Sequence, residues 1–153
     1  MIEKVISGGQ IGVDQAGLRA ARDNKIKTGG FAPRGYRTTN GPMPHLLKDR
    51  YGLVEAESDG YPQRTALNVK HSDGTIIIAL DPDSPGSKMT AKFCRQYKKP
   101  YHIIDLKEGN TSSLLIWKWI RKNGIKVLNV AGNRDSVSGE SAYEILNEVF
   151  KPF

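Results

Sequence analysis

Two short glycine-containing segments of the chain have the residue types that bind oxyanions. They read SGGQIGVD over residues 7–14 and SPGSKMT over residues 84–90. Each follows an apolar run and leads into a helical pattern, and a helix N-terminus offers unpaired N–H groups with a partial positive charge. Glycine also allows positive φ and a close approach of ligand to backbone. The candidate ligand-binding residues are Gly8, Gly9, Gln10, Gly12 and Asp14 in the first segment and Ser84, Gly86, Ser87 and Thr90 in the second.

Each segment also has a purely structural explanation. The first contains neither the G-x-G-x-x-G pattern of dinucleotide-binding loops nor the G-K-[ST] ending of a P-loop, so a tight strand-to-helix turn accounts for it equally well. In the second, Ser87 could cap the helix that follows. Ligand binding is favoured because two such loops on neighbouring parallel strands would face one crevice.

A third group of polar residues follows from helical spacing. Arg64 and Asn68 are four residues apart, so a helix places them on one face, with Thr65 beside them. Arg134 follows the last predicted strand and either contacts phosphate or pairs with Asp135. The functional interpretation is a polar wall that binds an anionic ligand, and the alternative for Arg64 is an ordinary solvated charge.

The elements that must position these residues alternate between strands and helices. Apolar runs predict strands at 3–7, 27–32, 75–80, 101–106 and 126–131, and helical spacing predicts helices at 14–23, 62–71, 87–98, 112–122 and 141–150. This alternation predicts a single α/β domain over residues 1–153, with a mainly parallel sheet between two helical layers. Such sheets bind ligands at the carboxyl ends of their strands, where the strand order reverses.

The segment 33–59 is rich in glycine and proline and shows little periodicity. A loop of this length is either functional or poorly ordered. Because it follows the second predicted strand, we expect a long loop or flap that covers the ligand crevice.

Composition narrows the class of protein. With 153 residues, 38% hydrophobic and 25% charged, the chain has the composition of a globular domain, and it contains neither a membrane-length apolar run nor a recognisable secretory signal. Cys94 is the only cysteine, which suits a reducing compartment, so we expect a cytoplasmic protein. The net charge of +7 attracts anions. Nucleic acid is an unlikely partner because the sequence contains no long Lys/Arg run, zinc-finger spacing or RNA-binding signature.

In combination these segments resemble the bacterial "putative molybdenum carrier" proteins. That group belongs to the SLOG superfamily, which also holds the lysine-decarboxylase-like phosphoribohydrolases and the DprA-like proteins. The matching stretches are SGGQIGVDQAGLRAA at 7–21, GGFAPRGYR at 29–37, GPMP at 41–44, YPQRTALNVKHSDGT at 61–75, SPGSKMT at 84–90, KPYHIIDL at 99–106 and LNVAGNRDS at 128–136. The resemblance implies a Rossmann-like SLOG fold, loops that bind nucleotide-like or phosphorylated ligands, and a homo-oligomer. Arg34, in the second stretch, is a further candidate ligand-binding residue.

The sequence departs from its relatives at two places. Thr39 and Asn40 stand where the family usually has an acidic pair, which argues against a cation role for that loop. The phosphoribohydrolases follow their glycine loop with a catalytic Glu, whereas Ala91 and Lys92 follow it here. An N-glycosidase needs a carboxylate, and Asp14 and Asp73 are the catalytic candidates only if the crevice brings them close together.

Three functions are therefore compared. The leading hypothesis is binding of a phosphorylated, nucleotide-derived ligand, which the protein senses or sequesters. The alternatives are a nucleoside-phosphate N-glycosidase or transferase and a carrier of molybdate or of the molybdenum cofactor. No metal site is predicted, because a single cysteine offers no thiolate set and His45, His71 and His102 lack metal-ligand spacing.

Overall fold

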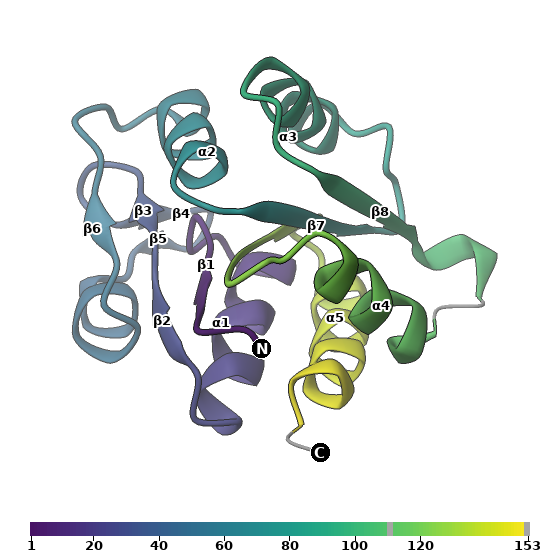
Figure 1. The fold of residues 1–153 in the computed structure, drawn as a ribbon. Helices are drawn as coiled ribbons and strands as arrows, with labels where there is room; N and C mark the ends of the chain where they lie inside the picture. The colour runs from purple at the N-terminus through teal and green to yellow at the C-terminus, as the bar shows by residue number, and fades with distance from the viewer. Residues whose placement is uncertain (110–111, 152–153) are drawn as a thin grey trace.

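The computed structural model of the chain describes residues 1–109 and 112–151. Its centre is a five-stranded sheet in the order β2-β1-β9-β7-β8, and all neighbouring strands in it are parallel. The strands are β1 (Lys4–Ile6), β2 (Lys27–Gly29), β7 (Gly74–Ala79), β8 (Tyr101–Asp105) and β9 (Val127–Gly132). The predicted α/β class with a parallel sheet is confirmed (Figure 1).

Helices cover both faces of this sheet (Figure 1). Helices α1 (Val13–Asp23), α4 (Ser113–Lys122) and α5 (Ser136–Phe150) lie on one face, and α2 (Tyr61–Lys70) and α3 (Pro85–Gln96) lie on the other. A short 3-10 helix, η2 (Leu106–Glu108), follows β8. Among the described residues, no helix has the length and apolar character that crossing a membrane requires.

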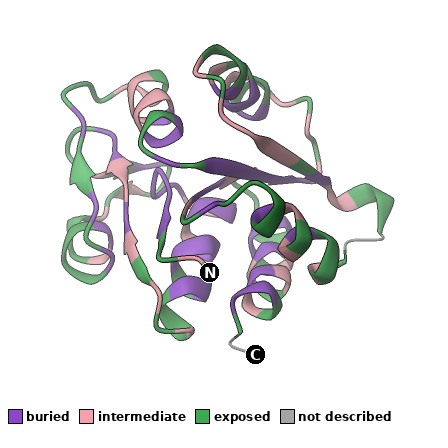
Figure 2. Ribbon diagram, in the orientation of Figure 1, coloured by how far each residue is buried: buried purple, intermediate pink, exposed green. Residues whose placement is uncertain are grey.

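The core forms where the sheet is buried on both faces. Ile76, Ile77 and Ile78 of β7 have no exposed surface, and a doubly covered strand needs such a continuous apolar run. Figure 2 shows most of β7 in the purple of buried residues. On α1 the predicted face of small residues is buried as expected. A Cβ atom at Gly17 would lie only 2.7 Å from Cγ1 of Val130, so this glycine lets α1 lie close against β9.

The predicted strand at 27–32 is wrong as one element, because Gly30 divides it. Gly30 has a φ of 122°, and the chain changes direction there. Residues 27–29 form β2 in the main sheet, whereas β3 (Phe31–Ala32) pairs with β6 (Val54–Glu55). A turn that uses positive φ is invisible to apolar periodicity, since glycine occurs in strands and turns alike.

The strand order corrects a second expectation, that the two glycine loops follow neighbouring strands. They follow β1 and β7, which are separated by β9. From β1 the chain crosses to β2 on one side, and from β7 it crosses to β8 on the other side. Strand order therefore reverses around β9, and a crevice at the carboxyl end of β9 is the expected ligand position in such a sheet.

Two helices begin at least two residues earlier than predicted. α3 begins at Pro85 rather than Ser87, and Ser84 caps it by accepting a hydrogen bond from Ser87 N. α5 begins at Ser136 rather than at residue 141, with Asp135 as the capping residue. In both cases a short polar residue that is equally common in loops, Ser84 or Asp135, caps the helix, so residue type alone does not fix where the helix begins.

The cap at Asp135 is expected to be worth about 1 kcal/mol of stability. Its carboxylate accepts hydrogen bonds from the N–H and the hydroxyl of Ser138, both at 2.8 Å. Burial is the largest single influence on the pKa of Asp135 and raises it, but the hydrogen bonds from Ser138 and from the backbone N–H groups of Asp135 and Val137 together outweigh it and hold the pKa below 3.8. Because the folded-state pKa is the lower one, the cap's contribution is present above pH 3.8 and is lost as the pH falls through the folded-state pKa.

Asp135→Ala should therefore lower the free energy of unfolding at neutral pH and have less effect in strong acid. Urea unfolding at several pH values measures this. A loss that is independent of pH would contradict the assignment of the effect to the ionised cap.

The segment 33–59 contains more regular structure than its sequence indicates. It includes the antiparallel pair β4 (Arg37–Thr38) and β5 (Gly41–Pro42), a π-helix η1 (His45–Arg50) and the strand β6. Leu47, Tyr51 and Leu53 are buried here and form a second small core with Leu18 of α1 and Ala32. This packing holds the segment against the first glycine loop, where Thr39 N donates a hydrogen bond to Gln10 Oε1 at 2.9 Å.

Candidate functional site

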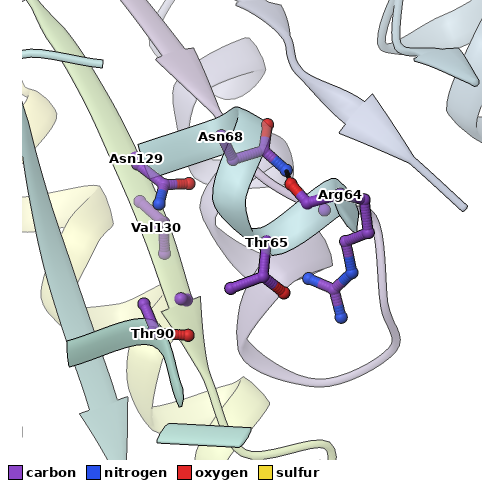
Figure 3. A pocket seen from close by; sticks show the side chains of 8 residues that line it. Arg64, Thr65, Asn68, Thr90, Asn129 and Val130 are labelled. Carbon is purple, nitrogen blue, oxygen red and sulfur yellow. Dashed lines mark hydrogen bonds between the residues drawn. The ribbon is translucent and has the colours of Figure 1, made fainter. Parts of the chain in front are cut away.

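A small cavity lies at the carboxyl end of β9, between α2 and α3. Its volume is about 10 Å³, roughly the space of one water molecule. Figure 3 shows side chains from three elements around it: Arg64, Thr65 and Asn68 from α2, Thr90 from α3, and Asn129 and Val130 from β9. The remaining lining residues are Gly8 and Ala131. The structure thus brings the predicted polar wall on α2 and parts of both loops to one place.

A buried ion pair dominates this site. Arg64 Nη1 lies 3.3 Å from Asp14 Oδ2, with 12% of the Arg64 side chain and 4% of the Asp14 side chain exposed. The same carboxylate oxygen accepts a hydrogen bond from Gln10 N at 3.2 Å. The guanidinium rests on the backbone of Gly8, where an added Cβ would lie 2.0 Å from Arg64 Nη1. Gly8 is therefore the residue that lets Arg64 reach Asp14.

The electrostatics of Asp14 reflect its burial. Burial raises the pKa of Asp14 above its ordinary value of 3.8, and Arg64, the N–H of Gln10 and Arg134 act in the opposite direction. Arg134 is exposed. Two guanidinium groups thus act on the charge of this one carboxylate.

The ring of Tyr61 lies close to both Arg64 and Arg134. The sequence did not indicate this role for Tyr61. The Arg134 guanidinium carbon lies 4.8 Å from the centre of the Tyr61 ring, and that of Arg64 lies 5.4 Å from it. An aromatic face attracts guanidinium groups at such distances. The available signal was the position of Tyr61 at the start of a helix that also carries Arg64, but a lone tyrosine before Pro62 has no distinctive spacing.

Three buried polar atoms in the described part of the chain have no hydrogen-bond partner. They are Gln10 Nε2, Arg64 Nε and Ser87 Oγ, and of these residues Arg64 lines the cavity. Gln10 and Ser87 are only 3% and 5% exposed. An unpaired buried donor costs about 1–3 kcal/mol, so each of the three requires an explanation. All three can donate hydrogen bonds, which is the property that an oxyanion site needs.

The first glycine loop uses most of its backbone N–H groups within the protein. Gly9 N donates to Ser7 Oγ, Ile11 N donates to Gln10 Oε1, and Val13 N donates to Asn133 O. Its glycines are also explained by packing. Gly12 has a φ of 83°, and a Cβ there would lie 2.5 Å from Asn133 O. These three N–H groups are therefore not free to bind a ligand, whereas Gln10 Nε2 has no partner in the protein.

A substitution at Gly9 is not a suitable test of ligand approach to the first loop. Its φ is 76°, and an added Cβ would lie 2.9 Å from side-chain atoms of Leu47 and Leu53. A bulky residue at Gly9 would therefore disturb the second core. Gly86 differs, because its φ is not positive and an added Cβ meets nothing within 4 Å.

The second loop is tied to the end of β9 by Asn133. Asn133 Oδ1 accepts a hydrogen bond from Asp81 N, and Asn133 Nδ2 donates to Asp81 O and to Ser84 Oγ. Ser84 thus combines this contact with its capping role. Thr90 Oγ1 donates to Gly86 O, which leaves the buried hydroxyl of Ser87 as the group on α3 without a partner among the described residues.

On α2 the predicted polar residues also make structural contacts. Asn68 Nδ2 donates to Phe31 O and Asn68 Oδ1 accepts from Phe31 N, both at 2.9 Å, so Asn68 holds β3 against α2. Thr65 Oγ1 donates to Tyr61 O within the helix. Arg64 is therefore the member of this group with an uncommitted buried donor.

Two predicted site residues lie away from the crevice. Asp73 precedes β7, at the amino edge of the sheet, where its carboxylate accepts hydrogen bonds from Lys126 N and Val127 N at 3.0 and 2.8 Å. The structure thus does not bring Asp73 to Asp14, because residues that start and end parallel strands lie at opposite edges. Arg34 lines a separate open hollow of about 350 Å³ with Glu55, Ala56 and Glu57.

The described residues contain no group of three or more His, Cys, Asp or Glu side chains that could hold a metal ion. Cys94 is fully buried within α3, and burial raises the pKa of its thiol. Of the three unpaired donors, the one on Arg64 belongs to a residue that lines the cavity, whereas Gln10 and Ser87 lie in the first glycine loop and in the first turn of α3. N–H and O–H groups of this kind bind an anion rather than a metal cation.

Comparisons with known proteins show the family and the fold of the chain. The model of the circularly permutated YpsA SLOG family matches residues 5–151. A crystal structure of a "putative molybdenum carrier protein" from Syntrophus aciditrophicus SB is 39% identical and superimposes with a TM-score of 0.87, covering 97% of this chain and 94% of that chain. A search of curated proteins gives no match. The resemblance to SLOG proteins and the Rossmann-like fold are thus both confirmed, and the chain belongs to the circularly permutated YpsA family of the SLOG superfamily.

Proposed function

We propose that the crevice at the end of β9 binds the phosphate group of a nucleotide-derived small molecule. The single observation that carries this proposal is the set of three buried unpaired donors, Gln10 Nε2, Arg64 Nε and Ser87 Oγ. A bound oxyanion would accept hydrogen bonds from such groups and remove the cost of their burial. The positive charge of Arg64 and Arg134 favours the same kind of ligand.

The size of the cavity limits how the ligand enters. A volume of about 10 Å³ admits no nucleotide while Arg64 lies across Gly8 toward Asp14. Binding therefore requires the Arg64 side chain to move, with the phosphate entering the crevice first. The rest of the ligand would lie at the mouth beside Tyr61 and Arg134, where an aromatic ring and a guanidinium group provide surfaces on which a base can stack.

Carriage of molybdate is the second candidate, and the name of the protein from Syntrophus aciditrophicus SB favours it. Molybdate is a tetrahedral oxyanion, so the same N–H and O–H donors fit it. The crevice offers no thiolate for direct ligation of molybdenum, since Cys94 is buried in α3. A molybdenum cofactor would be held here through its phosphate.

An N-glycosidase is the third candidate and depends on Asp14 alone. Its carboxylate is buried beside the proposed phosphate position, and a raised pKa is a property of many general acids. Asp73 does not contribute, because it lies at the opposite edge of the sheet.

Ser87→Ala separates binding from folding. The variant removes an unpaired buried hydroxyl, so we expect the free energy of unfolding to stay the same or to rise slightly. Affinity should fall about tenfold if that hydroxyl donates to a bound oxyanion. Isothermal titration with AMP, inorganic phosphate and molybdate measures the affinity and ranks the candidate ligands. Incubation with AMP followed by detection of free adenine tests the glycosidase.

Ser72→Ala is the matched control. Ser72 is 1% exposed, and its hydroxyl already donates to Val69 O at 3.0 Å. This variant should lose stability and keep its affinity. Unchanged affinity in Ser87→Ala for every anion that the wild type binds, or no binding of any of the three by the wild type, would refute the proposed site.

A further inference from the structure

We propose that Asp14 is a positioning residue that holds Arg64 until an oxyanion binds, and that it takes up a proton when Arg64 turns to that oxyanion. The proposal rests on the proposed function and adds to it a coupling between anion binding and protonation. In this proposal the guanidinium group of Arg64 pairs first with Asp14 and then with the bound oxyanion.

The geometry makes Asp14 the fixed member of the pair. It lies in the first turn of α1, and its Oδ2 is held by Gln10 N at 3.2 Å. Arg64 reaches across from α2 on a long side chain and contacts the same oxygen at 3.3 Å. Arg64 Nε, the buried donor without a partner, is on the same guanidinium group. An anion that takes this donor therefore competes with Asp14 for the charge of Arg64.

The charges around Asp14 determine whether it is protonated once the anion is bound. Arg64 approaches it from α2, and Arg134 acts on it from the turn between β9 and α5. Arg134 is exposed, so water screens its effect more than that of Arg64. When the anion draws Arg64 away, a buried carboxylate remains beside a second negative charge. Both changes favour the protonated form of Asp14.

The expected sign follows from linkage. If the pKa of Asp14 is higher with an anion bound than without one, protons bind together with the anion. Affinity is then greatest at low pH and falls as the pH rises between the two pKa values, by at most about tenfold per pH unit. Since burial already raises the pKa of Asp14 in the free protein, this fall begins above pH 3.8.

Sulfate is the probe, because it stays a dianion from about pH 5 to about pH 8 and any pH dependence then comes from the protein. Isothermal titration in two buffers with different ionisation enthalpies gives the affinity and the number of protons taken up. For the wild type we expect weaker binding at higher pH and uptake of up to about one proton per sulfate.

Asp14→Asn should bind sulfate with an affinity that no longer changes with pH, since an amide oxygen still accepts from Gln10 N but does not titrate. Asp59→Asn is the matched control. Its carboxylate forms an exposed pair with Arg37, and the wild-type pH profile should persist. A flat profile in the wild type, or an unchanged slope in Asp14→Asn, overturns the coupling and leaves the binding site in place. No sulfate binding by the wild type at any pH overturns both proposals.

Discussion

Arg64→Leu is expected to lower the free energy of unfolding by about 3–5 kcal/mol at about pH 8. Without Arg64, the carboxylate of Asp14 loses the partner at 3.3 Å while only 4% of its side chain is exposed. An isolated buried charge is far more costly than a buried pair, and truncation of one partner leaves that charge behind.

The loss of stability in Arg64→Leu should be larger at high pH than at low pH. Burial already raises the pKa of Asp14 above 3.8, and removal of Arg64 raises it further. A group whose pKa is higher in the folded state stabilises that state at low pH, and this contribution disappears as the pH rises. The difference between wild type and variant should therefore be large at about pH 8 and small at about pH 5, as measured by urea unfolding at both values.

Two further variants identify the source of the effect. Arg64→Leu combined with Asp14→Asn should recover most of the lost stability, because the amide carries no charge. Arg37→Leu disrupts a pair in which 50% and 68% of the side chains are exposed, and it should have little effect. An equal loss at both pH values, or no recovery in the double variant, would show that packing rather than charge explains the result.

Gly132→Ala is expected to prevent folding or to cost more than about 4 kcal/mol, a magnitude that only severe disruption of the core produces. An added Cβ would lie 1.9 Å from Ile78 O and 2.8 Å from Cγ1 of Val13. The first of these atoms belongs to the backbone of β7, which pairs with the central strand β9 at this register. Neither strand can move away without breaking the middle of the sheet.

Gly86→Ala is the matched control within a glycine loop. Its Cβ would meet nothing within 4 Å, and the residue lies in the first turn of α3. Alanine in a helix is favoured over glycine, so stability should be unchanged or up to about 1 kcal/mol higher. Thermal unfolding followed by circular dichroism compares the two variants. Similar melting temperatures would mean that the sheet can accommodate a side chain at Gly132.

The two variants also separate the roles of glycine in this protein. Gly12, Gly30 and Gly132 each face a backbone atom closer than a Cβ contact allows. Gly86 faces open space, so a bulky residue there tests ligand approach to the second loop without disturbing the fold. The glycines of the first loop are thus required by packing, whereas packing does not require the glycine of the second loop, Gly86.

The sequence by itself determined the layers of the fold. The apolar run at Ile76–Ile78 and the small-residue face of α1 report burial directly, because a strand or helix shows its environment through local periodicity. The sequence also selected Arg64, Asp14 and the two glycine loops as candidates for a site. The loops were selected by their residue types and their positions after strands, and Arg64 by its helical spacing with Asn68.

Only the tertiary structure decided how those parts meet. Strand order placed β9 between β1 and β7, and it left Asp73 at the opposite edge from Asp14. The pairing of Arg64 with Asp14 joins residues that are 50 positions apart, on helices that cover opposite faces of the sheet. Local propensity carries no information about such contacts, since they depend on where whole elements pack and on the space that Gly8 leaves for a guanidinium group.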